Sequence, residues 1–75
     1  MPGVMHYAYE QIEENKYKVC RFPYKLQRDN WIAAKSTRAK LLHSTFGNGL
    51  RFAARNVMRK MNADCVTVTY RPKKG

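Results

Sequence analysis

Two neighbouring segments near the C-terminus constrain the fold of this chain more than any other part of it. From Leu50 to Met61, apolar residues recur at the three- and four-residue spacing of one helix face. The segment from Cys65 to Tyr70 is rich in β-branched residues, and its larger apolar residues alternate strictly with Cys65, Thr67 and Thr69, which is typical of a strand. Residues 62–64 suit a turn between the two segments. We therefore predict a helix that packs on an antiparallel sheet.

The helix is predicted to cover about residues 49–62 and to follow a break in the chain at Gly47-Asn48-Gly49. Asn48 is a suitable N-cap for such a helix. We expect its apolar face to pack against apolar residues of the sheet, namely Leu50, Ala54, Val57, Met58 and Met61 against Ile32, Leu42, Val66 and Val68.

Two further strands are predicted in the N-terminal third of the chain. Met5–Ile12 and Tyr17–Phe22 both alternate, and the four polar residues between them suit a turn. Pro23 is expected to end the second strand because proline cannot donate a ladder hydrogen bond. The polar and basic residues 24–30 are expected to form a loop.

Residues 31–46 are compatible with either a helix or strands. A helix would begin at an Asp29 or Asn30 cap, but four consecutive polar residues, 35–38, interrupt its apolar face. Strands at Trp31–Lys35 and Ala39–Phe46 avoid this interruption, so we favour them. The resulting fold class is α+β, with a small antiparallel sheet of three or four strands packed on one principal helix. We expect a single domain over residues 1–75, with frayed ends at 1–3 and 73–75.

Cysteine usage and hydropathy bear on where such a chain works. Cys20 and Cys65 are too few for the disulfide framework of a small secreted domain. We expect both to be reduced and buried, in a cytoplasmic protein. The N-terminus lacks the basic and apolar regions of a signal peptide, and no apolar run approaches the ~20 residues of a membrane helix. No membrane contact is predicted.

Charge gives the strongest indication of a partner. The 75 residues include 15 Lys and Arg but only five Asp and Glu, for a formal net charge of +10. Residues 16–63 hold twelve basic residues against Asp29 alone, whereas residues 1–15 hold three glutamates and no Lys or Arg. Packing like charges this densely costs folding free energy through self-repulsion, which a bound polyanion would relieve.

Aromatic residues lie among these basic ones, and this combination is typical of nucleic-acid binding. Lys and Arg neutralise phosphates, while aromatic rings can stack on unpaired bases. We therefore predict a small, non-enzymatic nucleic-acid-binding module, with DNA preferred over RNA as the partner. The expected contacts, on a sheet face and a helix stripe, are Lys18, Arg21, Lys25, Arg28, Trp31, Lys35, Arg38, Lys40, Arg51, Arg55 and Arg59.

Other chemistry finds little support in the sequence. The two histidines, His6 and His43, and the two cysteines lack the paired spacing of zinc ligands. Gly47-x-Gly49 resembles a phosphate cradle at a helix N-terminus but lacks the Lys and Ser/Thr of a P-loop. We expect no catalytic residues, no metal and no cofactor.

A second hypothesis is a small viral or mobile-element protein that binds and inhibits a host protein or nucleoprotein complex. The edge of the tyrosine-rich first strand, Met5–Ile12, would then accept a strand of the partner. The protein is expected to be a monomer or a homodimer under either hypothesis.

The order of segments over residues 17–72 also resembles the AP2/ERF-type DNA-binding fold, which has three antiparallel strands and one packed helix. The residues that carry the resemblance are Tyr17–Arg21 for its first strand, Trp31–Ala34 for its second, Leu42–Phe46 for its third, and Ala53-Ala54-Arg55 for its helix. In that family the exposed sheet lies in the major groove. The resemblance implies DNA contacts from Arg21, Trp31, Lys35 and Arg38.

Overall fold

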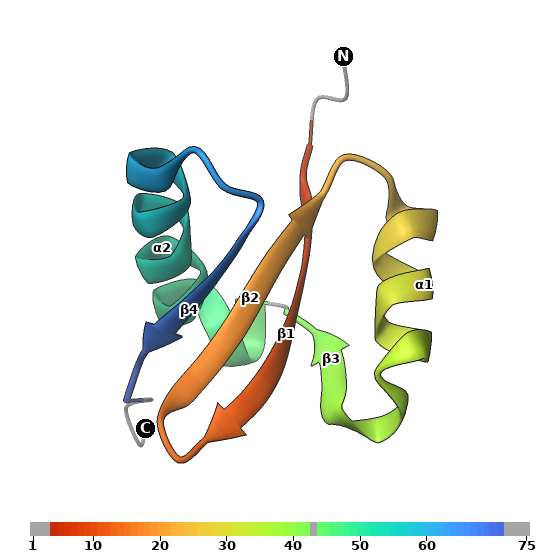
Figure 1. Cartoon of the computed structure of the whole chain (residues 1–75), viewed down its shortest axis with the longest axis horizontal. Helices are drawn as coiled ribbons and strands as arrows, with labels where there is room; N and C mark the ends of the chain where they lie inside the picture. Colours follow the sequence, from red (N-terminus) through yellow and green to blue (C-terminus); the bar gives the residue numbers. More distant parts are fainter. Residues whose placement is uncertain (1–3, 43, 72–75) are drawn as a thin grey trace.

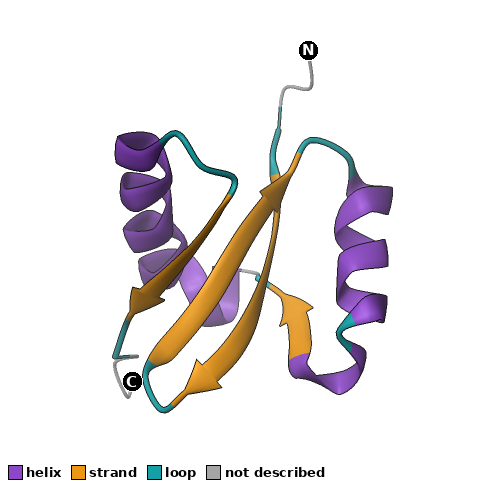
Figure 2. Cartoon of the chain, in the orientation of Figure 1, coloured by secondary structure: helices purple, strands orange, loops and turns teal. Residues whose placement is uncertain are grey.

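Within residues 4–42 and 44–71, which the computed structural model describes, four antiparallel strands form one sheet with a helix on each face (Figures 1 and 2). The α+β class predicted from the sequence is confirmed. The elements in chain order are β1 (His6–Glu13), β2 (Lys16–Phe22), α1 (Lys25–Ala34), a 3₁₀ turn (Ser36–Arg38), β3 (Ala39–Leu41), α2 (Ser44–Met61) and β4 (Cys65–Thr69).

The strand order is β3-β1-β2-β4, so the N-terminal hairpin forms the middle of the sheet. The chain reverses between β1 and β2 at the predicted turn, where Asn15 adopts a φ of 63°. Asparagine tolerates this left-handed conformation better than most residues. The Tyr70 amide donates a 2.8 Å hydrogen bond to the Asn15 carbonyl, which ties the end of β4 to the hairpin turn.

The two faces of the sheet carry different helices because strand side chains alternate. Tyr17 and Val19 of β2 belong to one buried cluster with Leu50, Ala54 and Met58 of α2. Phe22, on the opposite face of β2, contacts Trp31 of α1 with ring centres 6.0 Å apart. The main core therefore lies between the sheet and α2.

Most of the predicted core pairs are confirmed. Leu42, Val66 and Val68 pack against α2 in the main cluster. Met61 was expected there but is 66% exposed, because it lies at the last turn of the helix beyond the sheet. Ile32 was also expected there, but it lies on α1.

The predicted break at Gly47-Asn48-Gly49 is wrong, because α2 begins at Ser44 and continues through these residues. Glycine is a poor helix former but not an absolute barrier when packing favours the helix. At Gly49 the packing is specific, since an added Cβ would lie 2.9 Å from Cζ of Tyr70. Glycine at this position therefore accommodates the Tyr70 ring rather than a turn, and a larger residue would displace that ring.

The helix α1 was also not expected, since residues 24–30 were predicted as loop and Trp31–Lys35 as strand. The structure begins a helix at Lys25, directly after Pro23 and an extended Tyr24. Arg28, Trp31 and residue 32 recur at helical spacing and face the sheet, and the Arg28 side chain is only 14% exposed. Packing of this face on the sheet outweighs the poor helix propensity of residues 29 and 30.

The strand predicted at Ala39–Phe46 is present only as β3, and residues 44–46 belong to α2. His43 lies outside the described residues. The AP2/ERF-type resemblance assigned a strand to Trp31–Ala34, and that assignment is wrong because these residues are helical. The resemblance itself stays a prediction from the sequence.

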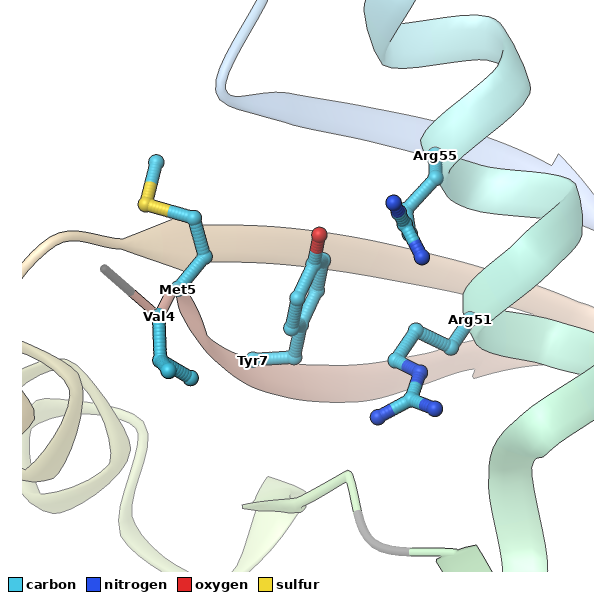
Figure 3. A pocket seen from close by; sticks show the side chains of 5 residues that line it. All are labelled: Val4, Met5, Tyr7, Arg51 and Arg55. Carbon is cyan, nitrogen blue, oxygen red and sulfur yellow. The ribbon is translucent and has the colours of Figure 1, made fainter.

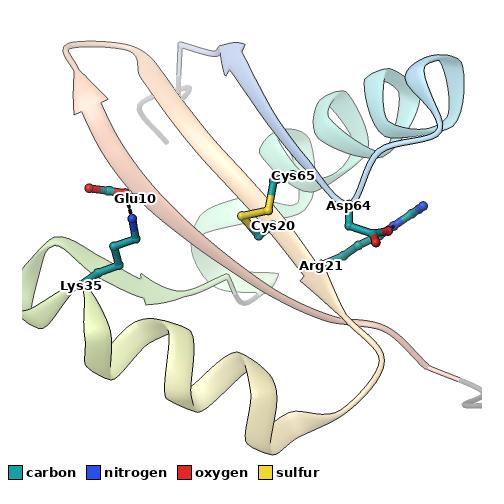
Figure 4. Close-up of a disulfide and its surroundings, with 6 residues drawn as sticks. All are labelled: Glu10, Cys20, Arg21, Lys35, Asp64 and Cys65. Carbon is teal, nitrogen blue, oxygen red and sulfur yellow. Dashed lines mark hydrogen bonds and ion pairs between the residues drawn. A yellow bond between two sulfur atoms is a disulfide. The ribbon is translucent and has the colours of Figure 1, made fainter.

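A disulfide joins Cys20 and Cys65, so the prediction of two reduced thiols is also wrong (Figure 4). These cysteines are 45 positions apart in the chain, but β2 and β4 pair in a register that sets them directly opposite each other. Their Cα atoms are 4.1 Å apart. The cysteines therefore no longer indicate a cytoplasmic location.

Within the described ranges, neither helix has the combination of length and apolar character needed to cross a bilayer.

Candidate nucleic-acid interface

Two carboxylates on the α1 side of the molecule pair with three of its basic residues. Glu10 of β1 points to this side, where its two oxygens lie 3.7 Å from Lys35 Nζ and 3.9 Å from Arg38 Nε (Figure 4 shows the Lys35 pair). Arg28 donates from Nε and Nη2 to Asp29 Oδ1 at 3.1 and 3.0 Å. Arg28, Lys35 and Arg38 therefore have carboxylate partners within the protein, whereas no ion pair within the described residues engages Lys18 or Lys25 on this side.

Arg21 is neutralised as well, although it lies on the other face of the sheet. Its Nε donates a 3.1 Å hydrogen bond to Asp64 Oδ1, and its backbone amide donates to the Asp64 carbonyl (Figure 4). Four of the eleven predicted contacts, Arg21, Arg28, Lys35 and Arg38, thus have internal carboxylate partners.

The helix α2 has the opposite character. Its 18 residues include Arg51, Arg55, Arg59 and Lys60 and no Asp or Glu. Within residues 4–42 and 44–71, no ion pair engages Arg55 or Arg59, and both are exposed. The helix α2 therefore combines four cations with no carboxylate. Within the described residues, ion pairs are also lacking at Lys16, Lys18, Lys25, Lys40 and Arg71 on the rest of the protein.

A pocket of about 330 Å³ lies between α2 and the start of β1 (Figure 3). Arg51 and Arg55 line it from the helix, and Tyr7 stands in its middle. Val4 and Met5 line the end away from the helix. The pocket thus has a cationic end and an apolar end, with a phenol between them.

An aromatic side chain also lies beside the arginines on the helix. Phe52 is 54% exposed, and the Cζ atoms of Arg51 and Arg55 lie 5.7 and 6.0 Å from its ring centre. These are cation–π distances. Phe52 therefore presents an open aromatic surface next to the two guanidinium groups that line the pocket.

The structure divides the predicted contact residues between separate surfaces. Lys40 lies on the same face as α2, because it sits directly opposite Tyr9 in the register and cross-strand partners share a face. Lys18 lies on the α1 face, opposite Glu10, and Lys25 is exposed at the start of α1. Trp31 is occupied by Phe22 and by Lys35, whose Nζ is 5.5 Å from the indole ring centre. Only Lys40, Arg51, Arg55 and Arg59 remain together on the α2 side.

Tyr7 and Phe52 belong to this surface but were not among the predicted contacts. The alternation of Tyr7 and Tyr9 placed both on one face but could not show that α2 leaves Tyr7 beside a pocket. Phe52 is an aromatic residue between Arg51 and Arg55 in the otherwise basic part of the helix. This position in the sequence could have identified it as a contact residue.

Burial changes the acidity of one tyrosine on the same face. The pKa of Tyr9 is raised above its ordinary value of 10.0, mainly by desolvation and further by the nearby Tyr17 hydroxyl. The two rings meet edge to face with centres 5.9 Å apart. Tyr9 is therefore a neutral phenol at neutral pH.

Two other sequence hypotheses lose their structural basis. Gly49 lies inside α2, so Gly47-x-Gly49 has no helix N-terminus at Leu50 with which to hold a phosphate. The middle of the edge proposed for a protein partner is covered, because β3 pairs with Ala8–Glu10 of β1 while β2 pairs along its other side.

Within the part of the chain that the structure describes, no three His, Cys, Asp or Glu side chains gather as metal ligands would.

No family model, curated protein or solved structure matches the chain. The geometry and charge of the molecule are therefore the observations on which a function is proposed.

Proposed function

We propose that the protein binds nucleic acid without catalysis, and that the α2 face is its contact surface. The observation that carries the proposal is the charge of α2: an 18-residue helix with four cations and no carboxylate, on a protein whose other basic residues are partly paired. Phosphate groups along a strand are the polyanion that such a surface would neutralise.

The arrangement of the cations supports a strand rather than a single small anion. Arg51, Arg55 and Arg59 follow one another at intervals of four residues, which places them along one stripe of the helix. A helix rises about 1.5 Å per residue, so successive arginines are about 6 Å apart along its axis. This separation is close to the spacing of consecutive phosphates in an extended strand.

The contact surface proposed here is narrower than the sequence suggested. Four predicted residues have carboxylate partners, and Trp31 is packed against Phe22. The Trp31–Phe22 contact and the Lys35–Glu10 ion pair join the α1 segment to the sheet, whereas Arg21 joins β2 to Asp64. The proposed contacts are the α2 arginines Arg51, Arg55 and Arg59, and Lys40 on the same face of the sheet.

Fluorescence anisotropy across a series of KCl concentrations tests the proposal. Labelled DNA and RNA oligonucleotides of one length should bind with affinities that fall linearly on a log–log plot against salt. Each phosphate contact contributes a slope of about 0.7 to 0.9. Arg55→Gln combined with Arg59→Gln should reduce the slope by about 1.4 to 1.8 and weaken binding at every salt concentration.

A matched control has the same change in net charge on the opposite side of the protein. Lys18→Gln combined with Lys25→Gln also removes two cations, one from the α1 face of β2 and one from α1. Its slope should stay within about 0.5 of the wild-type value. Equal losses from the two double variants would show that total charge, not the α2 face, governs binding. No binding of any oligonucleotide at low salt would refute the function.

The second hypothesis, inhibition of a host protein or nucleoprotein complex, stays a prediction from the sequence. It requires a surface other than the edge of β1, because that strand is interior to the sheet. A stoichiometric protein partner that survives nuclease treatment in a pull-down would favour it over the proposal above.

A further inference from the structure

The pocket beside α2 has a shape that a double helix cannot enter. In a duplex the bases are stacked inside and the phosphates lie on a convex outer surface. The pocket between Tyr7 and Arg55 is concave, and its volume of about 330 Å³ falls within the range of ~300–1,000 Å³ that proteins use for small organic ligands. It is larger than a lone phosphate requires.

The lining of the pocket matches the two halves of a nucleotide. Arg51 and Arg55 supply a cationic end, where guanidinium groups can each donate two parallel hydrogen bonds to a phosphate. The opposite end is apolar, with Met5 and Val4, and the Tyr7 ring stands between the two ends (Figure 3). A base would lie against the Tyr7 ring and the apolar residues, with its phosphate at the exposed guanidinium of Arg55 and within the positive field of Arg51.

Phe52 extends this arrangement along the strand. It lies on the helix between Arg51 and Arg55, within cation–π distance of both, and is 54% exposed. The arginine pair therefore has an aromatic ring in the pocket on one side and another on the helix surface. A phosphate at the arginines would have one neighbouring base at Tyr7 and the next at Phe52. This alternation of ring, cation and ring is the pattern of single-strand binding surfaces.

We infer that the α2 face selects single-stranded nucleic acid, with one unpaired nucleotide seated in the pocket between Tyr7 and Arg55 and the next base stacked on Phe52. This inference rests on the proposed function, since it names the form of nucleic acid that the same surface takes. Both bases must be unpaired to reach these rings, so a duplex has access only to the phosphate contacts.

Anisotropy with a single-stranded 12-nucleotide DNA and the corresponding duplex, at one salt concentration, tests the inference. Stacking of one base is worth about a 5- to 150-fold change in affinity. Phe52→Ala should therefore weaken single-strand binding by about fivefold or more and change duplex binding by less than about twofold, because the duplex makes no stacking contact. Since Phe52 is exposed, this substitution leaves the core intact.

Tyr7 is tested with a pair of variants because it also packs against the core. Tyr7→Leu removes the ring and should weaken single-strand binding selectively, whereas Tyr7→Phe keeps the ring and should retain it. Circular dichroism confirms that each variant is folded. Arg59→Gln is the matched control on α2 outside the pocket, and it should weaken single-strand and duplex binding by the same factor.

The outcomes separate the inference from the function. Selective loss of single-strand binding in Phe52→Ala and Tyr7→Leu would support the inference. Duplex binding at least as tight as single-strand binding, or equal losses on both substrates in these variants, would overturn it and leave nucleic-acid binding standing. Failure of wild-type protein to bind either substrate at low salt would overturn both.

Discussion

Loss of the Cys20–Cys65 disulfide should remove a large part of the stability of this protein. The bridge closes a loop between residues 45 positions apart. In the chain-entropy description, a loop of that length destabilises the unfolded state by about 4 kcal/mol, within the usual 2–5 kcal/mol for small domains. A 75-residue chain has a total unfolding free energy of roughly 4–11 kcal/mol. Reduction should therefore bring the protein close to its unfolding threshold.

The location of the bridge adds to this expectation. Cys20 is fully buried beside the interior strand β1, and Cys65 begins β4, which covers one edge of the sheet. Val66 and Val68, the residues through which β4 packs on α2, follow the bridge immediately. Without the covalent link, β4 is held to β2 by the ladder hydrogen bonds and these few side chains.

Urea unfolding followed by circular dichroism, with and without a phosphine reductant, measures the effect. With an m-value of about 1–3 kcal/mol/M, a loss of about 4 kcal/mol lowers the midpoint by roughly 1–4 M. The Cys20→Ala/Cys65→Ala variant should behave like the reduced protein and show no response to reductant. A change in unfolding free energy below about 1 kcal/mol would refute the argument. So would alkylation of both thiols in native, unreduced protein.

Three further predictions follow from contacts described above. Gly49→Ala should destabilise the protein by about 1–3 kcal/mol in thermal unfolding because the new Cβ meets the Tyr70 ring. In a Tyr70→Ala background the same change should instead stabilise α2 by up to ~1 kcal/mol. A gain in stability in both backgrounds would contradict the clash. Glu10→Gln should cost less than about 1 kcal/mol of stability, since the ion pairs of Glu10 with Lys35 and Arg38 are partly exposed. The affinity of this variant for duplex DNA should stay within about twofold of wild type, because the cations that lose their partner are on the α1 side. A strong gain in affinity would instead place the interface on the α1 side. The raised pKa of Tyr9 contributes stability that is present below the ordinary tyrosine pKa of 10.0 and is lost as pH rises through the folded value. The midpoint of unfolding should therefore fall less between pH ~9 and ~11 in Tyr9→Phe than in wild type. An equal fall in the two proteins would contradict that role.

The parts of the fold that local patterns could predict are those in which one residue spacing dominates. The hairpin turn, the end of β2 at Pro23, the apolar face of α2 and the alternation of β4 all follow from such spacing. The helix α1 was missed although Lys25–Arg28 and Ala33-Ala34 are good helix formers, because its sequence has only a short apolar face. The role of that face becomes evident only in the fold, where Trp31 packs on Phe22.

Contacts between distant segments also explain the remaining differences. The disulfide depends on the register of β2 against β4, which two isolated cysteines do not reveal. The continuation of α2 through Gly49 depends on Tyr70, more than twenty residues later in the sequence. For the candidate site, the sequence predicted a cationic surface, but only the fold shows which cations Glu10 and Asp64 already neutralise.

The strand order β3-β1-β2-β4 has a consequence for how the polypeptide acquires its structure during synthesis. The first two strands to leave the ribosome form the centre of the sheet, while the strands that flank them arrive later. An isolated hairpin has only marginal stability in water. A nascent chain that stops before Cys65 leaves the outer edge of β2 unpaired, so stable folding must wait until β4 has emerged.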